Sequence, residues 1–363
     1  MAIVYQFEPH ELQEKLRAVR TERYACQSVA RKAVPNERVG MCLRRINGSN
    51  VKVLKHKKTS KAFYDGLLVC GSVWLCPVCA AKISERRKTE IKQAFEMHKS
   101  EGGNIGMLTL TFSHKKTDRL KDTIQKFGKA TTKFMSGRAF NDIRLEMDLI
   151  GRIRVFEVTY GSNGFHPHVH IALFYKNEVD LNKIKLKMYE LWEKACEKFE
   201  IKTTLKHGID LQGADEAEAY LSKHGTWSLE QELSKSHIKK AKNDSMTPFD
   251  FLRRYLETED EKLLNLFREY MECFKGKRQI QWSQGLKKRF VLPEKTDEEL
   301  AKEKVEEADA LGMLSYSDWK QILKSDQRSL FLDRVEKFGF DSAYILTLKK
   351  ESSATEDSNS KEI

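Results

Sequence analysis

The sequence predicts an α+β protein with an antiparallel sheet at its centre and helices on its flanks. Three observations lead to this fold class. Short runs alternate apolar and polar residues, as half-buried strands do. Two of these runs, at 152–160 and 164–175, are joined by the turn sequence GSNG and predict a β-hairpin. Other stretches, such as 181–199, carry apolar residues at helical spacing.

The elements follow one another as strand, helix, hairpin, helix, strand and helix. The corresponding segments are 104–114, about 120–135, 152–175, 181–199, 207–213 and 214–224. A helix is also predicted after Cys79, over 80–99. Another should begin at TPFDFL, with Thr247 as N-cap and Pro248 at the first helical position. Residues 1–65 read as basic and irregular, and residues 296–340 as helical.

Composition limits the class of partner. A chain of 363 residues, 40% of them hydrophobic, can bury one to three cores. The formal net charge of +12 favours a polyanion, with nucleic acid before membrane. Apolar runs fall short of the ~20 residues of a membrane span, and the first ten residues show no signal-peptide pattern. We therefore expect a cytoplasmic protein that does not enter a membrane.

Three histidines mark a candidate metal site. His166, His168 and His170 alternate along the predicted strand 164–175, so their side chains should share one face. Glu157 lies across the turn and could join them as a third ligand, although a solvent-facing role is equally compatible with its position. Two imidazoles and one carboxylate suit Mn²⁺ or Mg²⁺ acting on a phosphate oxygen. The role of His166 stays open, because Pro167 places it near a strand start or edge.

Seven cysteines are present, and five of them lie in the first 80 residues. Cys76-Pro-Val-Cys79 has the spacing of a zinc knuckle, and Cys70 lies six residues upstream. Cys42 is the preferred fourth ligand and Cys26 the second choice. We predict structural zinc, since disulfides are rare in a reducing cytosol. Cys196 and Cys273 are isolated and read as core thiols.

A candidate nucleophile lies in the segment EAEAYLSKH. In a helix, Glu216 and Lys223 would share a face with Tyr220, one turn before it and one turn after it. A partly buried tyrosine with ion pairs would look the same. Basic residues near the cysteines are candidate DNA contacts. These are Arg44, Arg45, Lys57, Lys58, Arg86 and Arg87.

Six blocks, in this order, resemble the replication initiators of rolling-circle plasmids, within the HUH endonuclease superfamily. The resemblance covers about 70–290 and is closest to the branch with a single tyrosine and a catalytic glutamate. The blocks are CGSVWLCPVCAAKISERR (70–87), MLTLTFSH (107–114), GFHPHVHIALF (164–174), EAEAYLSKH (216–224), TPFDFL (247–252) and KGKRQIQWSQGLKK (275–288).

The resemblance implies a five-stranded antiparallel sheet and a role for each site residue. His168 and His170 would hold Mg²⁺ or Mn²⁺, with Glu157 as the third ligand. Tyr220 would attack a DNA phosphate, become linked to the 5′ end and leave a 3′-OH primer. Glu216 would help a water molecule at termination, and Lys223 would lie near the phosphate. His224 receives no role.

The division expected from these features has four parts. They are a basic N-terminal region with the zinc site (1–100), an HUH/RRM-like nuclease domain (101–230), a helical C-terminal region (231–348) and a disordered tail (349–363). Expected partners are double- and single-stranded origin DNA, together with a host polymerase. A host helicase is also expected, because the sequence contains no GxxxxGK[ST] motif. The oligomeric state stays open.

Two other functions remain as alternatives. HPHVHIA also fits the His-φ-His-φ-His-φ-φ pattern of histidine-triad nucleotide hydrolases, if proline counts as φ, although this reading leaves the tyrosine segment and WSQGLKK unexplained. A zinc-containing DNA-binding regulator without catalysis would have no need of the His-x-His pair. The leading hypothesis is a site-specific nickase that starts plasmid rolling-circle replication.

Overall fold

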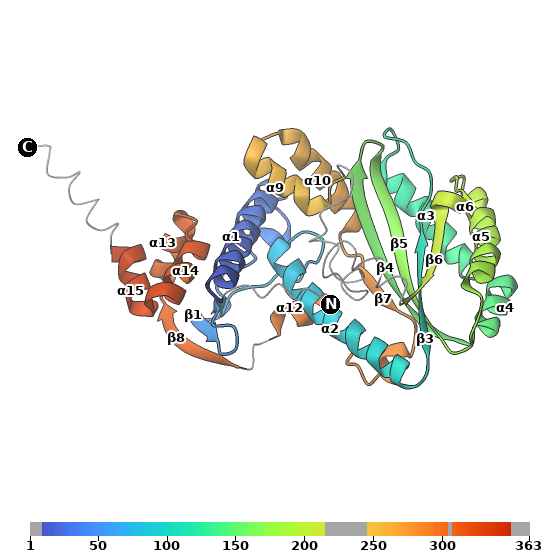
Figure 1. The fold of residues 1–363 in the computed structure, drawn as a ribbon. Coiled ribbons are helices and arrows are strands. Elements are labelled where there is room, and N and C mark those ends of the chain that lie inside the picture. Colours follow the sequence, from blue (N-terminus) through green and yellow to red (C-terminus); the bar gives the residue numbers. More distant parts are fainter. Residues whose placement is uncertain (1–8, 215–244, 304–306, 350–363) are drawn as a thin grey trace, which may run out of the picture. The chain divides into compact units, whose positions relative to one another are not determined.

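The computed structural model describes residues 9–214, 245–303 and 307–349 (Figure 1). The chain forms two compact units, and each is considered by itself. Unit 1 combines residues up to 72, residues 76–79 and residues from 298 onward, while unit 2 combines residues 73–75 and 80–297. The segment 215–244 is not among the described residues, so the helix predicted at 214–224 lies almost entirely outside them.

Unit 2 is built on a five-stranded antiparallel sheet, which confirms the predicted fold class. The strands are β3 (Asn104–Leu110), β4 (Leu149–Gly161), β5 (Gly164–Tyr175), β6 (Ile209–Gly213) and β7 (Ile280–Trp282). Their order across the sheet is β6-β3-β5-β4-β7, and every neighbouring pair is antiparallel. Strand β5 is therefore central, and the short β7 forms one edge.

The β4–β5 hairpin turns where the sequence predicted. Gly161 pairs with Gly164, so only Ser162 and Asn163 lie in the turn. Gly164 has φ +85°, a conformation that residues with a Cβ rarely adopt. The same register brings Glu157 directly opposite His168.

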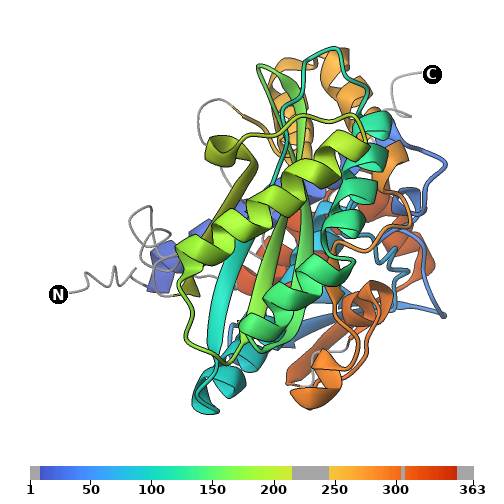
Figure 2. The same ribbon diagram turned by 90° about the vertical axis from the view of Figure 1, so that its right-hand side faces the viewer.

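One face of the sheet is covered by α3 (Leu120–Phe134), α4 (Arg138–Glu146) and α5 (Leu181–Lys198), and we call it the α3 face (Figure 2). Val169, Ile171 and Leu173 of β5 point into its core. They pack in one buried cluster with Phe127 of α3 and Trp192 of α5, both with 0% of their surface exposed. The alternation of β5 thus supplies every second residue to this core.

The opposite face, the α2 face, carries a second core. Ala172 and Phe174 of β5 pack there with Ile91 and Phe95 of α2 (Pro77–Ser100) and with Leu286 of α11 (Leu286–Arg289). The other helices of unit 2 are α6 (Leu205–Gly208), α9 (Pro248–Thr258) and α10 (Glu261–Phe274), whereas α12 (Asp297–Lys302) belongs to unit 1 except for its first residue. Helix α9 starts as predicted, with Thr247 as N-cap and Pro248 in its first turn.

Unit 1 contains a three-stranded sheet in the order β2-β1-β8. Its elements are α1 (Pro9–Ala33), β1 (Val51–His56), β2 (Ala62–Asp65), β8 (Ala308–Leu314), α13 (Tyr316–Lys324), α14 (Arg328–Phe338) and α15 (Phe340–Tyr344). Val51 and Val53 of β1 pack in one core with Trp319 of α13 and Phe331 of α14.

Two expectations for unit 1 are corrected. Residues 9–33 form helix α1 instead of an irregular arm, because Cys26, Val29, Ala30 and Ala33 make a buried stripe at helical spacing among the charges. Residues 308–314, expected to be helical, form strand β8 because they pair with β1. Among the described residues, none of the helices is long and apolar enough to cross a membrane.

Candidate functional site

Glu157, His168 and His170 meet on the α2 face, on the adjacent strands β4 and β5. Glu157 Oε2 lies 3.1 Å from His168 Nε2 and 3.2 Å from His170 Nε2. One ligand atom from each residue lies within 4.8 Å of the others. The three side chains converge because the two histidines are two residues apart on β5 and Glu157 faces His168 across the ladder.

Hydrogen bonds orient both imidazoles toward this point. His168 Nδ1 lies 3.2 Å from the carbonyl oxygen of His166, and in the tautomer in which Nδ1–H donates to it, the Nε2 lone pair is available to a cation between the ring and Glu157. His170 Nδ1 lies 3.0 Å from Thr109 Oγ1 on β3. Ring orientation by a partner on the second nitrogen is typical of histidines that bind metals.

The donor set fits one divalent cation. Six ligands arranged octahedrally at about 2.1 Å from an ion place neighbouring donor atoms about 3 Å apart. The carboxylate-to-imidazole distances of 3.1 and 3.2 Å match that spacing. Two histidines and one carboxylate would fill only half of such a shell, which leaves positions for substrate oxygens.

The carboxylate of Glu157 is enclosed by apolar and aromatic side chains. Only 3% of its surface is exposed, and Phe249 of α9 and Tyr270 of α10 line the small cavity next to it. Burial, together with the negative charge of Glu157, raises the pKa of Tyr270 well above its usual value. A buried carboxylate is costly unless positive charge or hydrogen bonds compensate it, and the two imidazoles supply groups that can do so.

His166 lies beside the Glu157–His168–His170 group but is not part of it. Its Nδ1 lies 2.7 Å from His114 Nε2, and its Nε2 lies 3.0 Å from Thr111 Oγ1. Burial and the neighbouring His168 and His114 lower the pKa of His166 to about 3, so the ring is neutral at physiological pH. His114 and His166 also line a polar cavity of about 570 Å³.

Several of these neighbours were missed in the sequence. Thr109, Thr111 and His114 belong to the block MLTLTFSH, which was read only as a buried strand and a family motif. The two threonines are two residues apart, so both face the histidines of β5. Polar residues at period two in an otherwise apolar strand were the signal that could have identified them.

Tyr220, Glu216 and Lys223 all lie in 215–244, outside the described residues. Their roles remain predictions.

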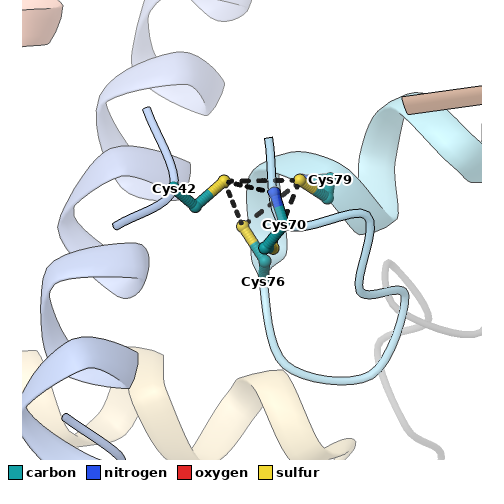
Figure 3. A group of neighbouring side chains, drawn as sticks. All are labelled: Cys42, Cys70, Cys76 and Cys79. Carbon is teal, nitrogen blue, oxygen red and sulfur yellow. Dashed lines mark hydrogen bonds between the residues drawn. The ribbon is translucent and has the colours of Figure 1, made fainter. Parts of the chain in front are cut away.

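Unit 1 holds a second candidate metal centre, made of four buried cysteines (Figure 3). The Sγ atoms of Cys42 and Cys70 each lie 3.5 Å from Cys79 Sγ, and Cys76 Sγ lies 3.8 Å from Cys42 Sγ. These distances exceed the ~2.05 Å of a disulfide. They approach the ~3.8 Å expected between sulfurs bound at 2.3 Å to one tetrahedral ion. Cys26, the other candidate for fourth ligand, is not in this group.

Hydrogen bonds among these sulfurs shift the pKa values of Cys76 and Cys79 in opposite directions. Burial by itself would raise the pKa of Cys76, but hydrogen bonds from the thiols of Cys42, Cys70 and Cys79 outweigh it and hold that pKa well below its usual value. Hydrogen bonds with Cys42 and Cys70 raise the pKa of Cys79 in turn. A bound cation would let all four sulfurs act as thiolates, so the donor chemistry fits a metal ion.

The six predicted DNA contacts differ in exposure. Lys57 and Lys58 are exposed beyond the end of β1, within 3.5 Å of Asp309 and 3.1 Å of Glu307 respectively. Arg45 and Arg86 are exposed, and Arg44 is half-buried. Arg87 is different, because its buried guanidinium is paired with Glu90 at 2.9 Å and Asp297 at 2.8 Å. The positive charge of Arg87 is therefore compensated by these two carboxylates within unit 2.

Comparison with known proteins identifies the family. Residues 68–327 match the model of a family described as "Replication protein". This match covers more than half of the chain, and the protein belongs to that family of replication proteins.

Three individual relatives share about 27–32% of their aligned residues with this chain. The chain is 27% identical over 295 residues to "Protein rep" of Streptomyces lividans, across 62% of this chain and 64% of the relative. It is 32% identical over 130 residues to "Neomycin resistance protein" of Streptomyces cyanogenus, covering 29% and 30% of the two chains. "Protein rep" of Lentilactobacillus hilgardii is 32% identical over 105 residues, covering 28% and 32%. The alignments span less than two thirds of each relative. No solved structure matches this chain significantly.

The geometry predicts that Glu157→Gln weakens divalent-cation binding. The amide keeps the shape of the side chain but removes the charge that faces both histidines. We expect an affinity about 10–100-fold lower, the range found when a ligand or its close partner is lost. Mn²⁺ titration followed by electron paramagnetic resonance measures this, and Glu178→Gln, an exposed acid, is the control. Equal affinities in both variants would remove Glu157 from the ligand set.

Proposed function

We propose that this protein initiates rolling-circle replication of a plasmid by nicking one strand of the origin. The observation that carries the proposal is the Glu157–His168–His170 group on the central strands of a chain in the replication protein family. The "Protein rep" relatives support the same assignment. Origin DNA, first double-stranded and then single-stranded, would be the substrate, with a host helicase and polymerase as partners in the cytoplasm.

In the nicking step, Tyr220 would be the nucleophile. Its phenol oxygen would form a bond to the phosphorus of the scissile phosphate while the bond from phosphorus to O3′ breaks. The phenol proton would be transferred to the departing oxygen, which becomes the 3′-OH primer. Glu157, His168 and His170 would hold Mg²⁺ or Mn²⁺, which supplies positive charge next to the phosphate oxygens. Lys223 would add a second positive charge near this phosphate.

Termination needs a second nucleophile, because the single phenol of Tyr220 is consumed by the first cleavage. Glu216, four residues before Tyr220 in the sequence, would act as general base toward a water molecule. Water rather than a second tyrosine would then release the product. This division of roles follows from the resemblance to the single-tyrosine branch.

We also assign structural Zn²⁺ to Cys42, Cys70, Cys76 and Cys79. Four buried sulfurs with tetrahedral spacing offer a closed set of donors, which is typical of structural zinc. No coordination position would remain for a substrate. The proposed ion would stabilise the fold of unit 1.

A nicking assay tests the central proposal. The purified protein is incubated with a supercoiled plasmid that carries the cognate origin, with and without Mn²⁺. Conversion to the open-circular form only with the ion, together with a protein–DNA adduct, supports the nickase. Hydrolysis of nucleoside phosphates without nicking would favour a histidine-triad hydrolase. Origin binding without either reaction would leave a DNA-binding regulator.

Replacing the nucleophile separates chemistry from binding. Tyr220→Phe should abolish the covalent adduct on a denaturing gel, while origin affinity changes by no more than about twofold, because phosphate contacts dominate affinity. Tyr255→Phe, the next tyrosine along the chain, is the control and should still form the adduct. An adduct that persists in Tyr220→Phe places the nucleophile elsewhere.

Glu216→Ala should separate the two cleavage events. Nicking and adduct formation should continue, whereas termination fails and multimeric or linear single-stranded products accumulate. Glu218→Ala, two residues away, is the control and should terminate normally. Loss of nicking in Glu216→Ala would mean that Glu216 acts earlier, as a ligand or as the base for Tyr220.

Cys76→Ser should release about one zinc per chain and lower the melting temperature, since structural zinc binding contributes directly to folding. Cys196→Ser is the matched control, because Cys196 is also fully buried but lies in the core of unit 2. Metal content is measured by atomic absorption on protein purified without chelators. Zinc-free parent protein would contradict the assignment.

A further inference from the structure

A wide groove lies on the α3 face of unit 2, away from the histidines. It has a volume of about 1060 Å³ and is bounded by α3, β4, β7 and the loop that precedes β7. Six of its lining residues are cationic, and no aspartate or glutamate is among the residues that line it. The cationic residues are Lys121, Lys129, Lys133, Arg154, Lys277 and Arg278. This excess of positive charge distinguishes the groove from an apolar ligand pocket.

The lysines of α3 form a row along the groove. Lys121, Lys129 and Lys133 are spaced by multiples of four residues, so they follow one side of the helix. From Lys121 to Lys133 the helix rises about 18 Å. One strand of duplex DNA advances about 3.4 Å per nucleotide, so the row is about as long as five phosphates at that spacing.

Most of this charge is not neutralised within the described chain. Lys129, Lys133 and Arg278 make no ion pair with any other described residue. The half-buried guanidinium of Arg154 donates to the neutral oxygen Oε1 of Gln281. Burial and the nearby charge of Arg152 lower the pKa of Arg154. A half-buried cation with a neutral partner is well suited to an incoming anion.

Aromatic rings lie among the cations. Phe156 of β4 and Phe199, which follows α5, are half-buried and line the same groove. Proteins that bind single strands combine a cationic path for the backbone with aromatic faces for the bases. The groove has both features.

The end of the groove lies close to the metal group. Trp74 and Gln279 line both the groove and the small cavity beside Glu157. Phe156 and Glu157 are adjacent on β4 and therefore point to opposite faces of the sheet. Among the described residues, the three-residue strand β7 and the single residue Met246 pair with β4 along this edge.

We propose that this groove binds the backbone of single-stranded DNA next to the cleavage site. The choice of DNA rests on the proposed function, whereas the selection of a polyanion follows from the groove itself. The block KGKRQIQWSQGLKK acquires a role, because Lys277, Arg278 and Gln281 all come from it. The groove would hold the strand displaced or delivered at the nick.

The test reverses two charges of the row. Lys129→Glu/Lys133→Glu in the full-length protein should bind a labelled single-stranded oligonucleotide at least about tenfold more weakly by fluorescence anisotropy. The slope of log K against log salt should become shallower by about 1.4, or 0.7 for each of two phosphate contacts. Both measurements are made in EDTA, so they do not depend on cleavage.

The matched control is Lys194→Glu/Lys198→Glu on α5. These lysines are also exposed, also four residues apart and change the net charge equally, but they do not line the groove. The parent, control and groove variants should have similar melting temperatures, since like charges at this spacing contribute little to helix stability. Equal losses of affinity in the two variants would overturn the proposal.

Two further arms separate the remaining outcomes. A larger loss for duplex than for single-stranded DNA in the groove variant would overturn the assignment to a single strand. If the parent protein fails to nick while the groove variant, unlike the control variant, binds DNA more weakly than the parent, this result would contradict the proposed function but support the role of the groove in DNA binding. If the groove variant nicks normally and binds single-stranded DNA as tightly as the parent, the proposed role of the groove is wrong and the proposed function stands.

Discussion

Strand β5 sends its side chains alternately to the two faces of the sheet, and unit 2 is organised around this alternation. Val169, Ile171 and Leu173 pack under α3 and α5, while His168 and His170 face the opposite side. Because β5 is the central strand, both neighbours contribute to each face. Thr109 comes from β3 and Glu157 from β4. A slip of one residue would bury the imidazoles in the apolar core and expose the apolar residues.

The burial of Glu157 next to His168 and His170 has an electrostatic consequence. A carboxylate that is 3% exposed loses most of its hydration, at a cost of several kcal/mol unless charge compensates it. Phe249 and Tyr270 provide no such charge on their side of Glu157. Among the described residues, the two imidazoles lie 3.1 and 3.2 Å from the carboxylate, and a cation between the three donors would add to the compensation. The three donors therefore favour a positive charge at the point where they converge.

Local patterns allowed much of this arrangement to be predicted. The hairpin and its GSNG turn, the period-two histidines and Glu157 all depend on residues within 20 positions of one another. Non-local pairing could not be predicted in the same way. Strand β8 pairs with β1 from more than 250 residues away, and its own sequence gives no hint of that partner. Spacing also left Cys26 and Cys42 as alternatives, and only the folded chain brings the Cys42 sulfur to the other three.

The two faces of β4 carry different chemistry through the same alternation. Val155 and Glu157 face α2 and the histidines, whereas Arg154 and Phe156 face the cationic groove. The groove was invisible in the sequence, because its charges come from three distant segments that only the sheet and α3 bring together. Reading β4 by itself would suggest a strand with polar residues on both faces, and hence an edge. It is instead an interior strand whose two faces meet separate groups of side chains, one anionic at Glu157 and one cationic at Arg154. In the proposed binding mode, a polyanion that follows the cations would approach the metal-binding group near Trp74 and Gln279, because these two residues line both the groove and the cavity beside Glu157.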